Sequence, residues 1–157
     1  MNDKRIVSMS PAATETLFML GLDDSIIGVS AFCLRPEQAK LKRKVGSFTS
    51  YSQSIMDDLK PDIIFTVAGI QDKIARKLSE KYNVIGIKMP ESVNGILENI
   101  DTIAASTDTE TEAEDLKRML YQNITPNKNG MEFTGYVEMD MNGPISSGSS
   151  SYINDAL

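Results

Sequence analysis

The sequence of 157 residues contains no histidine and a single cysteine, Cys33. Histidine is the commonest general base and the commonest metal ligand, so its absence removes the usual centre of both kinds of site. One cysteine forms neither a disulfide nor a cysteine zinc cluster within one chain. We interpret Cys33 as a small buried hydrophobe. We therefore predict no catalytic residue, no metal site and no cofactor, and hence a protein that is not an enzyme.

Signals for nucleotides and nucleic acids are also missing. The turn at residues 8–12 has no glycine, whereas a dinucleotide-binding turn needs glycines for close approach to the pyrophosphate. Lys and Arg number 16 against 22 Asp and Glu, a net charge of −6, and the basic residues form no stripe interleaved with aromatic residues. Nucleic acid is therefore not an expected partner.

The N-terminus shows no export signal. Residues 1–9, MNDKRIVSM, run directly into an apolar segment without basic, apolar and cleavage regions in series. The residues alone leave two alternatives open. The protein is cytoplasmic, or an export signal is not part of this sequence.

Short apolar segments alternate with amphipathic ones in the first ninety residues. Strands are expected at 5–9, 25–29, 62–67 and 83–87. Between them, Ser10 is a candidate helix N-cap followed by Pro11, a second helix ends before Pro61, and a third covers 71–81. This order predicts an α/β fold, a doubly wound and mostly parallel sheet of about four strands.

The pattern changes after Pro90. An amphipathic helix capped by Ser92 is expected up to Ile103, and a second helix near Thr109, where Glu112 completes a capping box. Residues 123–130 are rich in turn formers, 132–139 alternate like a half-buried strand, 142–151 indicate a loop, and 152–157 indicate the start of a helix. We predict a lobe at 1–106, a linking helix and linker at 107–129, and the start of an incomplete second lobe at 130–157.

Two blocks of residues carry a resemblance to a known family. RIVSMSPAATETLFMLGLDDSIIGVSAFCLRPEQA and VGSFTSYSQSIMDDLKPDIIFTVAG resemble the opening lobe of the periplasmic cobalamin, haem and ferric-siderophore binding proteins, in which a rigid helix joins two lobes. GPISSGSSSYINDAL is similar to the beginning of their second lobe. The resemblance implies the solute-binding component of an ABC importer for a metal chelate, a ferric siderophore or a corrinoid. It also implies an extracytoplasmic location, periplasmic or as a membrane-anchored lipoprotein.

The candidate ligand site follows from the sheet and the resemblance together. Ligands of parallel sheets bind beyond the carboxyl ends of the strands, where aromatic side chains suit a large planar ligand. The expected ligand-binding residues are Ser10, Phe32, Phe48, Tyr51 and Gly69, with Ser146 and Ser147 facing them from the second lobe. Loop anchors that pack on the sheet are the alternative interpretation of the aromatic residues, and a flexible linker that of the serines.

The match also shows departures from the family. Cobalamin-binding members present aromatic groups at the positions of Phe32, Phe48, Val67 and Ile145, and only the first two are aromatic here. The tyrosine ligand of haem-binding relatives falls near Ser47. A glutamate that meets the importer's membrane subunit in relatives aligns with Ser54, which is a departure from the family. Asp57 and Asp58, one turn further on, are the residues expected to dock in its place.

Two alternative functions remain beside this interpretation. The first is a cytoplasmic interaction or regulatory domain derived from the same lobe, and the second is an enzyme, which would have to work through carboxylates alone. A separate expectation concerns assembly: the native partners of the strand at 132–139 are expected to lie outside this sequence, and an unpaired strand tends to join another chain. We therefore expect a homodimer through residues 130–157, or a segment that folds back on the first lobe or is poorly ordered.

Overall fold

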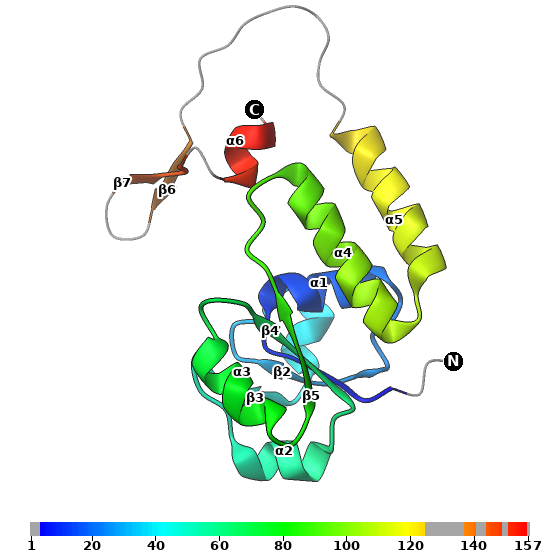
Figure 1. Cartoon of the computed structure of the whole chain (residues 1–157), viewed down its shortest axis with the longest axis vertical. Helices are drawn as coiled ribbons and strands as arrows, with labels where there is room; N and C mark the ends of the chain where they lie inside the picture. Colours follow the sequence, from blue (N-terminus) through cyan, green and yellow to red (C-terminus); the bar gives the residue numbers. More distant parts are fainter. Residues whose placement is uncertain (1–3, 125–136, 141–143, 149–150, 157) are drawn as a thin grey trace, which may run out of the picture.

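The computed structural model of the chain describes residues 4–124, 137–140, 144–148 and 151–156 (Figure 1). Its centre is a five-stranded parallel sheet in the order β3-β2-β1-β4-β5. The strands are β1 (Ile6–Ser8), β2 (Ile26–Ser30), β3 (Lys44–Gly46), β4 (Ile63–Val67) and β5 (Asn83–Ile87). The predicted parallel α/β sheet is confirmed.

The expected count of about four strands is wrong because β3 was not predicted. This strand has three residues, too few for a periodic pattern, and it forms by pairing with β2 at the edge of the sheet. The chain reaches β3 from β2 through a short 3-10 helix, η1 (Glu37–Leu41).

Five α-helices surround this sheet. They are α1 (Pro11–Met19), α2 (Gln53–Leu59), α3 (Asp72–Ser79), α4 (Val93–Thr107) and α5 (Glu110–Asn123). Buried residues of α1, α4 and α5 share one hydrophobic cluster with the sheet, and those of α2 and α3 share another. Helices therefore cover both faces, as the doubly wound prediction requires.

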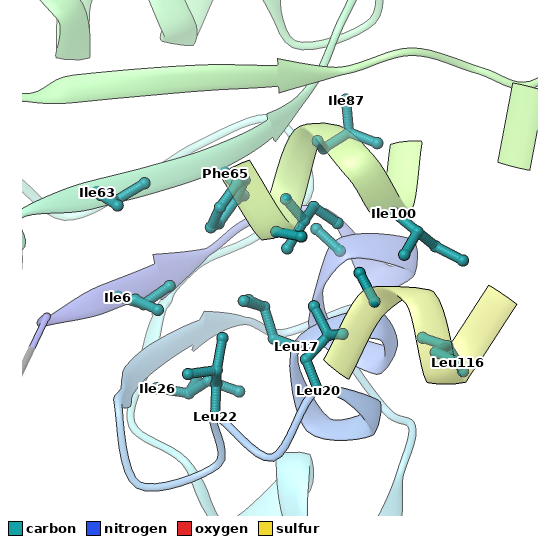
Figure 2. Packing of buried hydrophobic residues seen from close by; sticks show 14 of the residues in the cluster. Ile6, Leu17, Leu20, Leu22, Ile26, Ile63, Phe65, Ile87, Ile100 and Leu116 are labelled. Carbon is teal, nitrogen blue, oxygen red and sulfur yellow. The ribbon is translucent and has the colours of Figure 1, made fainter. Parts of the chain in front are cut away.

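Alternate strand residues supply the two cores. Ile6 and Phe65 belong to the cluster with α1, α4 and α5, whereas Val7 and Ile64 belong to the cluster with α2 and α3. Figure 2 shows the first cluster, with Ile6 and Phe65 from the strands pointing toward Leu17 of α1. Every residue of β4 is buried, which explains why its continuous apolar run predicted a strand covered on both faces.

The predicted N-cap side chains are present at two helices, α1 and α4, and the one predicted for α5 is absent. The Oγ of Ser10 accepts a hydrogen bond from the Ala13 N–H, and that of Ser92 accepts one from the Gly95 N–H. The expected capping box at Thr109 and Glu112 is wrong, because Thr109 makes no side-chain cap hydrogen bond. Its hydroxyl pairs at 2.9 Å with that of Thr107.

The C-terminal part forms a separate hairpin and a short helix. Strand β6 (Glu138–Asp140) pairs antiparallel with β7 (Pro144–Ser146), and α6 (Tyr152–Ala156) follows. The expected loop at 142–151 thus contains a strand. β6 finds a partner within the chain, so the expectation that the partners of the strand at 132–139 lie outside this sequence is wrong for residues 138–139. Residues 132–136 of the expected strand lie outside the described residues. The homodimer and the boundaries at 106 and 129 stay predictions.

Helix α6 packs on the lobe rather than on the hairpin. It contacts α4, and the Asp155 carboxylate accepts a hydrogen bond of 2.8 Å from the Val93 N–H. Figure 1 shows α6 beside the beginning of α4. No helix in the described part of the chain is both long enough and apolar enough to cross a membrane.

Candidate functional site

All five strands of the parallel sheet end at the same edge, and apolar side chains are exposed there. Phe32 and Leu34 follow β2, Ile70 follows β4 and Met89 follows β5, and each is 53–62% exposed. Phe48, which follows β3, is half-buried. Exposed apolar groups that gather at one place mark binding surfaces. We call this edge the carboxyl edge.

Two aromatic rings meet at the carboxyl edge. The ring centroids of Phe32 and Phe48 are 5.6 Å apart with an interplanar angle of 62°, an edge-to-face pair. Phe32 is 55% exposed, so the pair lines an open surface instead of filling the core. The predicted proximity of the two rings and the open position of Phe32 are therefore confirmed, Phe48 is half-buried, and the contact of the pair with a ligand stays a prediction.

A buried amide, which the sequence did not single out, holds the loop that carries Phe48. Gln71 is 1% exposed, and its Nε2 donates to the carbonyl oxygens of Phe48 at 2.7 Å and Met9 at 3.2 Å. Its Oε1 accepts from the Val67 N–H at 2.8 Å. Gln71 thus joins the ends of β1 and β4 to the β3–α2 loop, at the point where the strand order reverses.

The β3–α2 loop folds tightly over its own strand. Gly46 forms a bridge with Tyr51, and a Cβ at Gly46 would lie 2.1 Å from the Ser50 carbonyl oxygen. Glycine is therefore the residue that lets the loop close at this point. Tyr51 is half-buried and packs on the cluster of α2 and α3, and its contact with a ligand stays a prediction.

Ser10 and Gly69 lie at the ends of neighbouring strands. Ser10 is 2% exposed and its hydroxyl caps α1. Gly69 is exposed with φ +81°, a conformation that favours glycine, and its N–H donates to the Asp72 carboxylate at 2.8 Å. Their contacts with a ligand stay predictions.

The two serines of the second block lie in and after the hairpin. Ser146 ends β7, opposite Glu138, and half-buried Ser147 follows it. In Figure 1 the hairpin lies on the side of the five-stranded sheet toward which β5 points. That these serines face Phe32 and Phe48 stays a prediction.

Cys33 follows Phe32 in the sequence and is buried next to two hydroxyl groups. Its Sγ is within 3.0 Å of the Thr14 hydroxyl and 3.3 Å of the Ser30 hydroxyl, and it is fully buried in the core cluster. It therefore packs as a small core residue. Among the described residues, no three His, Cys, Asp or Glu side chains gather as a metal site would require.

The residues expected to dock on an importer lie on α2. The Asp57 carboxylate accepts hydrogen bonds from Lys81, from the Tyr82 hydroxyl at 2.8 Å and from Gln53 at 2.9 Å. The Lys81 ammonium, followed by Tyr82 and Gln53, lowers the pKa of Asp57 to about 2. Asp58 pairs with Arg43 at 2.5 Å. Both carboxylates already have partners, and their docking role stays a prediction.

Comparison with known proteins agrees with this geometry. The sequence profile of the periplasmic binding protein family matches residues 6–131. The chain is 35% identical over 99 residues to the vitamin B12-binding protein of Vibrio campbellii, covering 63% of this chain and 35% of that protein. It is 25% identical over 125 residues to an uncharacterized ABC transporter substrate-binding lipoprotein of Bacillus subtilis, covering 77% and 40%.

A solved structure shows the same fold over almost the whole chain. It is described as a possible iron-binding periplasmic solute-binding protein of Staphylococcus epidermidis, and matches with a TM-score of 0.80 at 22% identity, over 97% of this chain and 63% of that one. The profile match over residues 6–131 shows that the chain belongs to the periplasmic binding protein family, and its resemblance to the first lobe is confirmed. It spans 35% and 40% of the length of the two curated relatives.

Proposed function

We propose that this chain forms one wall of the ligand cleft in the solute-binding component of an ABC importer. Its ligand is a metal chelate, a ferric siderophore or a corrinoid. The observation that carries the proposal is the edge-to-face pair of exposed Phe32 and half-buried Phe48 at the carboxyl edge, with Ile70 and Met89 exposed at the same edge. A large ligand with apolar surface gains most from such a wall.

The proposed protein binds its ligand and catalyses no reaction. Its partner is the importer's membrane subunit, and its place is outside the cytoplasm, in the periplasm or on a lipid anchor. The family match and the lipoprotein among the relatives support both statements. No relative described above supports the cytoplasmic regulatory alternative.

Equilibrium dialysis against cyanocobalamin, haem and a ferric trihydroxamate tests the proposal, because each of these chelates is measured by its own absorbance. We expect binding of at least one of them, and weaker binding by the double variant Phe32→Ala, Phe48→Ala. The control is Met119→Ala, which removes an exposed apolar side chain from α5. No binding tighter than millimolar to any of the three would refute the proposal.

A stability measurement separates a ligand contact from a folding defect. Each Phe→Ala change should lower the free energy of unfolding far less than Phe65→Ala, since Phe65 is fully buried and such a core truncation costs about 3–5 kcal/mol. A loss of roughly 3 kcal/mol or more at Phe32 or Phe48 would instead identify that ring as a core residue.

A further inference from the structure

A groove borders the β3–α2 loop, which also carries Phe48 of the aromatic pair. It has a volume of about 550 Å³, within the size range of small-molecule sites, and it runs between this loop and α3. Tyr51, Ile70 and Ile74 supply apolar surface, Thr49 and Ser50 supply hydroxyls, and Lys73 and Lys77 line its α3 side. We call it the loop–α3 groove.

The groove is continuous with the carboxyl edge. Ile70 lines the groove and is also one of the exposed apolar residues that follow the strands. Thr49 directly follows Phe48, whose ring meets Phe32. The groove and the aromatic pair therefore share one loop, which Gln71 holds in place through the Phe48 carbonyl oxygen.

The groove brings together two lysines that have no carboxylate partner among the described residues. Elsewhere on the described surface, Lys81 pairs with Asp57 and Lys117 with Asp101 and Glu114, whereas residues such as Lys60 and Lys88 form no ion pair with a described carboxylate. Lys73 and Lys77 form no ion pair with any described carboxylate. They stand four residues apart on α3, a spacing at which like charges repel each other.

We propose that Lys73 and Lys77 bind the negatively charged periphery of an anionic chelate whose apolar part rests on Phe32 and Phe48. The inference rests on the proposed function and makes it narrower, because it selects anionic chelates over neutral ones. In a chain of net charge −6, an anionic ligand is repelled by the overall field and needs local cations of this kind. Two unpaired ammonium groups beside apolar surface meet that need.

Two ferric chelates of different charge test the inference: a trianionic ferric tris-catecholate and a neutral ferric trihydroxamate. Equilibrium dialysis at low salt should show tighter binding of the trianion. The double variant Lys73→Gln, Lys77→Gln should weaken binding of the trianion about tenfold and leave the neutral chelate unchanged, as expected for two exposed charge contacts. Added salt should weaken the trianion alone.

The control is the double variant Lys40→Gln, Lys60→Gln, which removes the same charge from residues outside the groove. An equal loss of trianion binding in this control would show a general charge effect and overturn the inference. Binding of both chelates by the wild type with no loss in Lys73→Gln, Lys77→Gln would overturn the inference and leave the proposed function standing. Binding of neither chelate by the wild type would overturn the inference. In that case, binding of cyanocobalamin or haem would still support the proposed function, and binding of neither would refute it.

Discussion

The side-chain amide of Gln71 donates a 2.7 Å hydrogen bond to the carbonyl oxygen of Phe48, 23 residues away in the sequence. The same amide satisfies the Met9 carbonyl oxygen and the Val67 N–H. Three backbone segments therefore meet at one buried side chain. Because Phe48 forms the aromatic pair with Phe32, this amide links the core of the lobe to the position of its candidate ligand wall.

Replacing Gln71 by Leu tests that link. The change keeps the side-chain volume but leaves the buried Met9 carbonyl oxygen and Val67 N–H without their partner, which should lower the free energy of unfolding by roughly 2–4 kcal/mol. Urea unfolding measures the loss as a lower midpoint at constant slope. Gln38→Leu, at an exposed site, is the control and should change little. A loss at Gln71 no larger than at Gln38 would contradict the assignment.

The strands that the sequence predicted correctly are those with a continuous apolar run. β4 is buried along its whole length, and β1 sends neighbouring residues into two cores, so their letters carried the signal. β3 forms by pairing with β2, and its three residues are too few to show a strand pattern in the sequence. The meeting of Phe32 and Phe48 was predictable because parallel strands end at one edge.

Gln71 could not be found in the same way. A glutamine before a helix is ordinary in sequence, and its burial arises only when segments near Met9, Phe48 and Val67 come together. Ile70 and Met89 did leave a signal, since each is an apolar residue just after an expected strand. The pairing of β6 with β7 was missed because the three residues of β7 begin with proline in a segment rich in turn formers.

Gly46 offers a second test of the loop that carries Phe48. In Gly46→Ala the new Cβ would meet the backbone of Ser50 and Tyr51, at 2.1 Å and 2.6 Å, so the loop must move. We expect a loss of about 1–3 kcal/mol in the free energy of unfolding, as for other overpacked sites. A change in the NMR shifts of residues 47–51 should accompany it.

Gly95→Ala is the matched control for this change. Gly95 lies in α4 with its nearest neighbours at 3.5 Å, so alanine fits and should stabilise the helix by roughly 0.5–1 kcal/mol. Opposite signs at the two glycines would support the close approach at Gly46. A stabilised Gly46→Ala variant would show that the loop is not packed on the strand in solution.

The pH dependence of stability should report on Asp57. Hydrogen bonds from Lys81, Tyr82 and Gln53 lower the pKa of Asp57 in the folded protein to about 2, from an ordinary value of 3.8. Because the folded pKa is the lower one, the stabilisation is fully present above about pH 4 and is lost as the pH falls toward 2. The difference in unfolding free energy between wild type and Asp57→Asn should therefore shrink over this range.

Urea unfolding between pH 2 and 6 measures that difference. Asp58→Asn is the control. Asp58 pairs with Arg43 at the surface, whereas Asp57 accepts hydrogen bonds from three side chains. A difference between wild type and Asp57→Asn that is the same at pH 2 and pH 6 would show that the carboxylate is not held by these three donors. It would also leave Asp57 free for contact with a partner.

The hydrogen bond between Asp155 and Val93 tests how the C-terminal helix meets the lobe. The Val93 N–H is one of the first donors of α4 and has no partner inside the helix, so the Asp155 carboxylate satisfies a group that water would otherwise solvate. In Asp155→Ala, amide exchange at Val93 should become faster, and stability should fall by less than about 1 kcal/mol. Asp155→Asn keeps an acceptor oxygen and should show a smaller change.

Ser92→Ala serves as the control within the same helix turn, because it should speed amide exchange at Gly95 rather than at Val93. Unchanged exchange at Val93 in Asp155→Ala would mean that α6 does not rest on α4 in solution, and the segment at 130–157 would then be free to pair with a second chain.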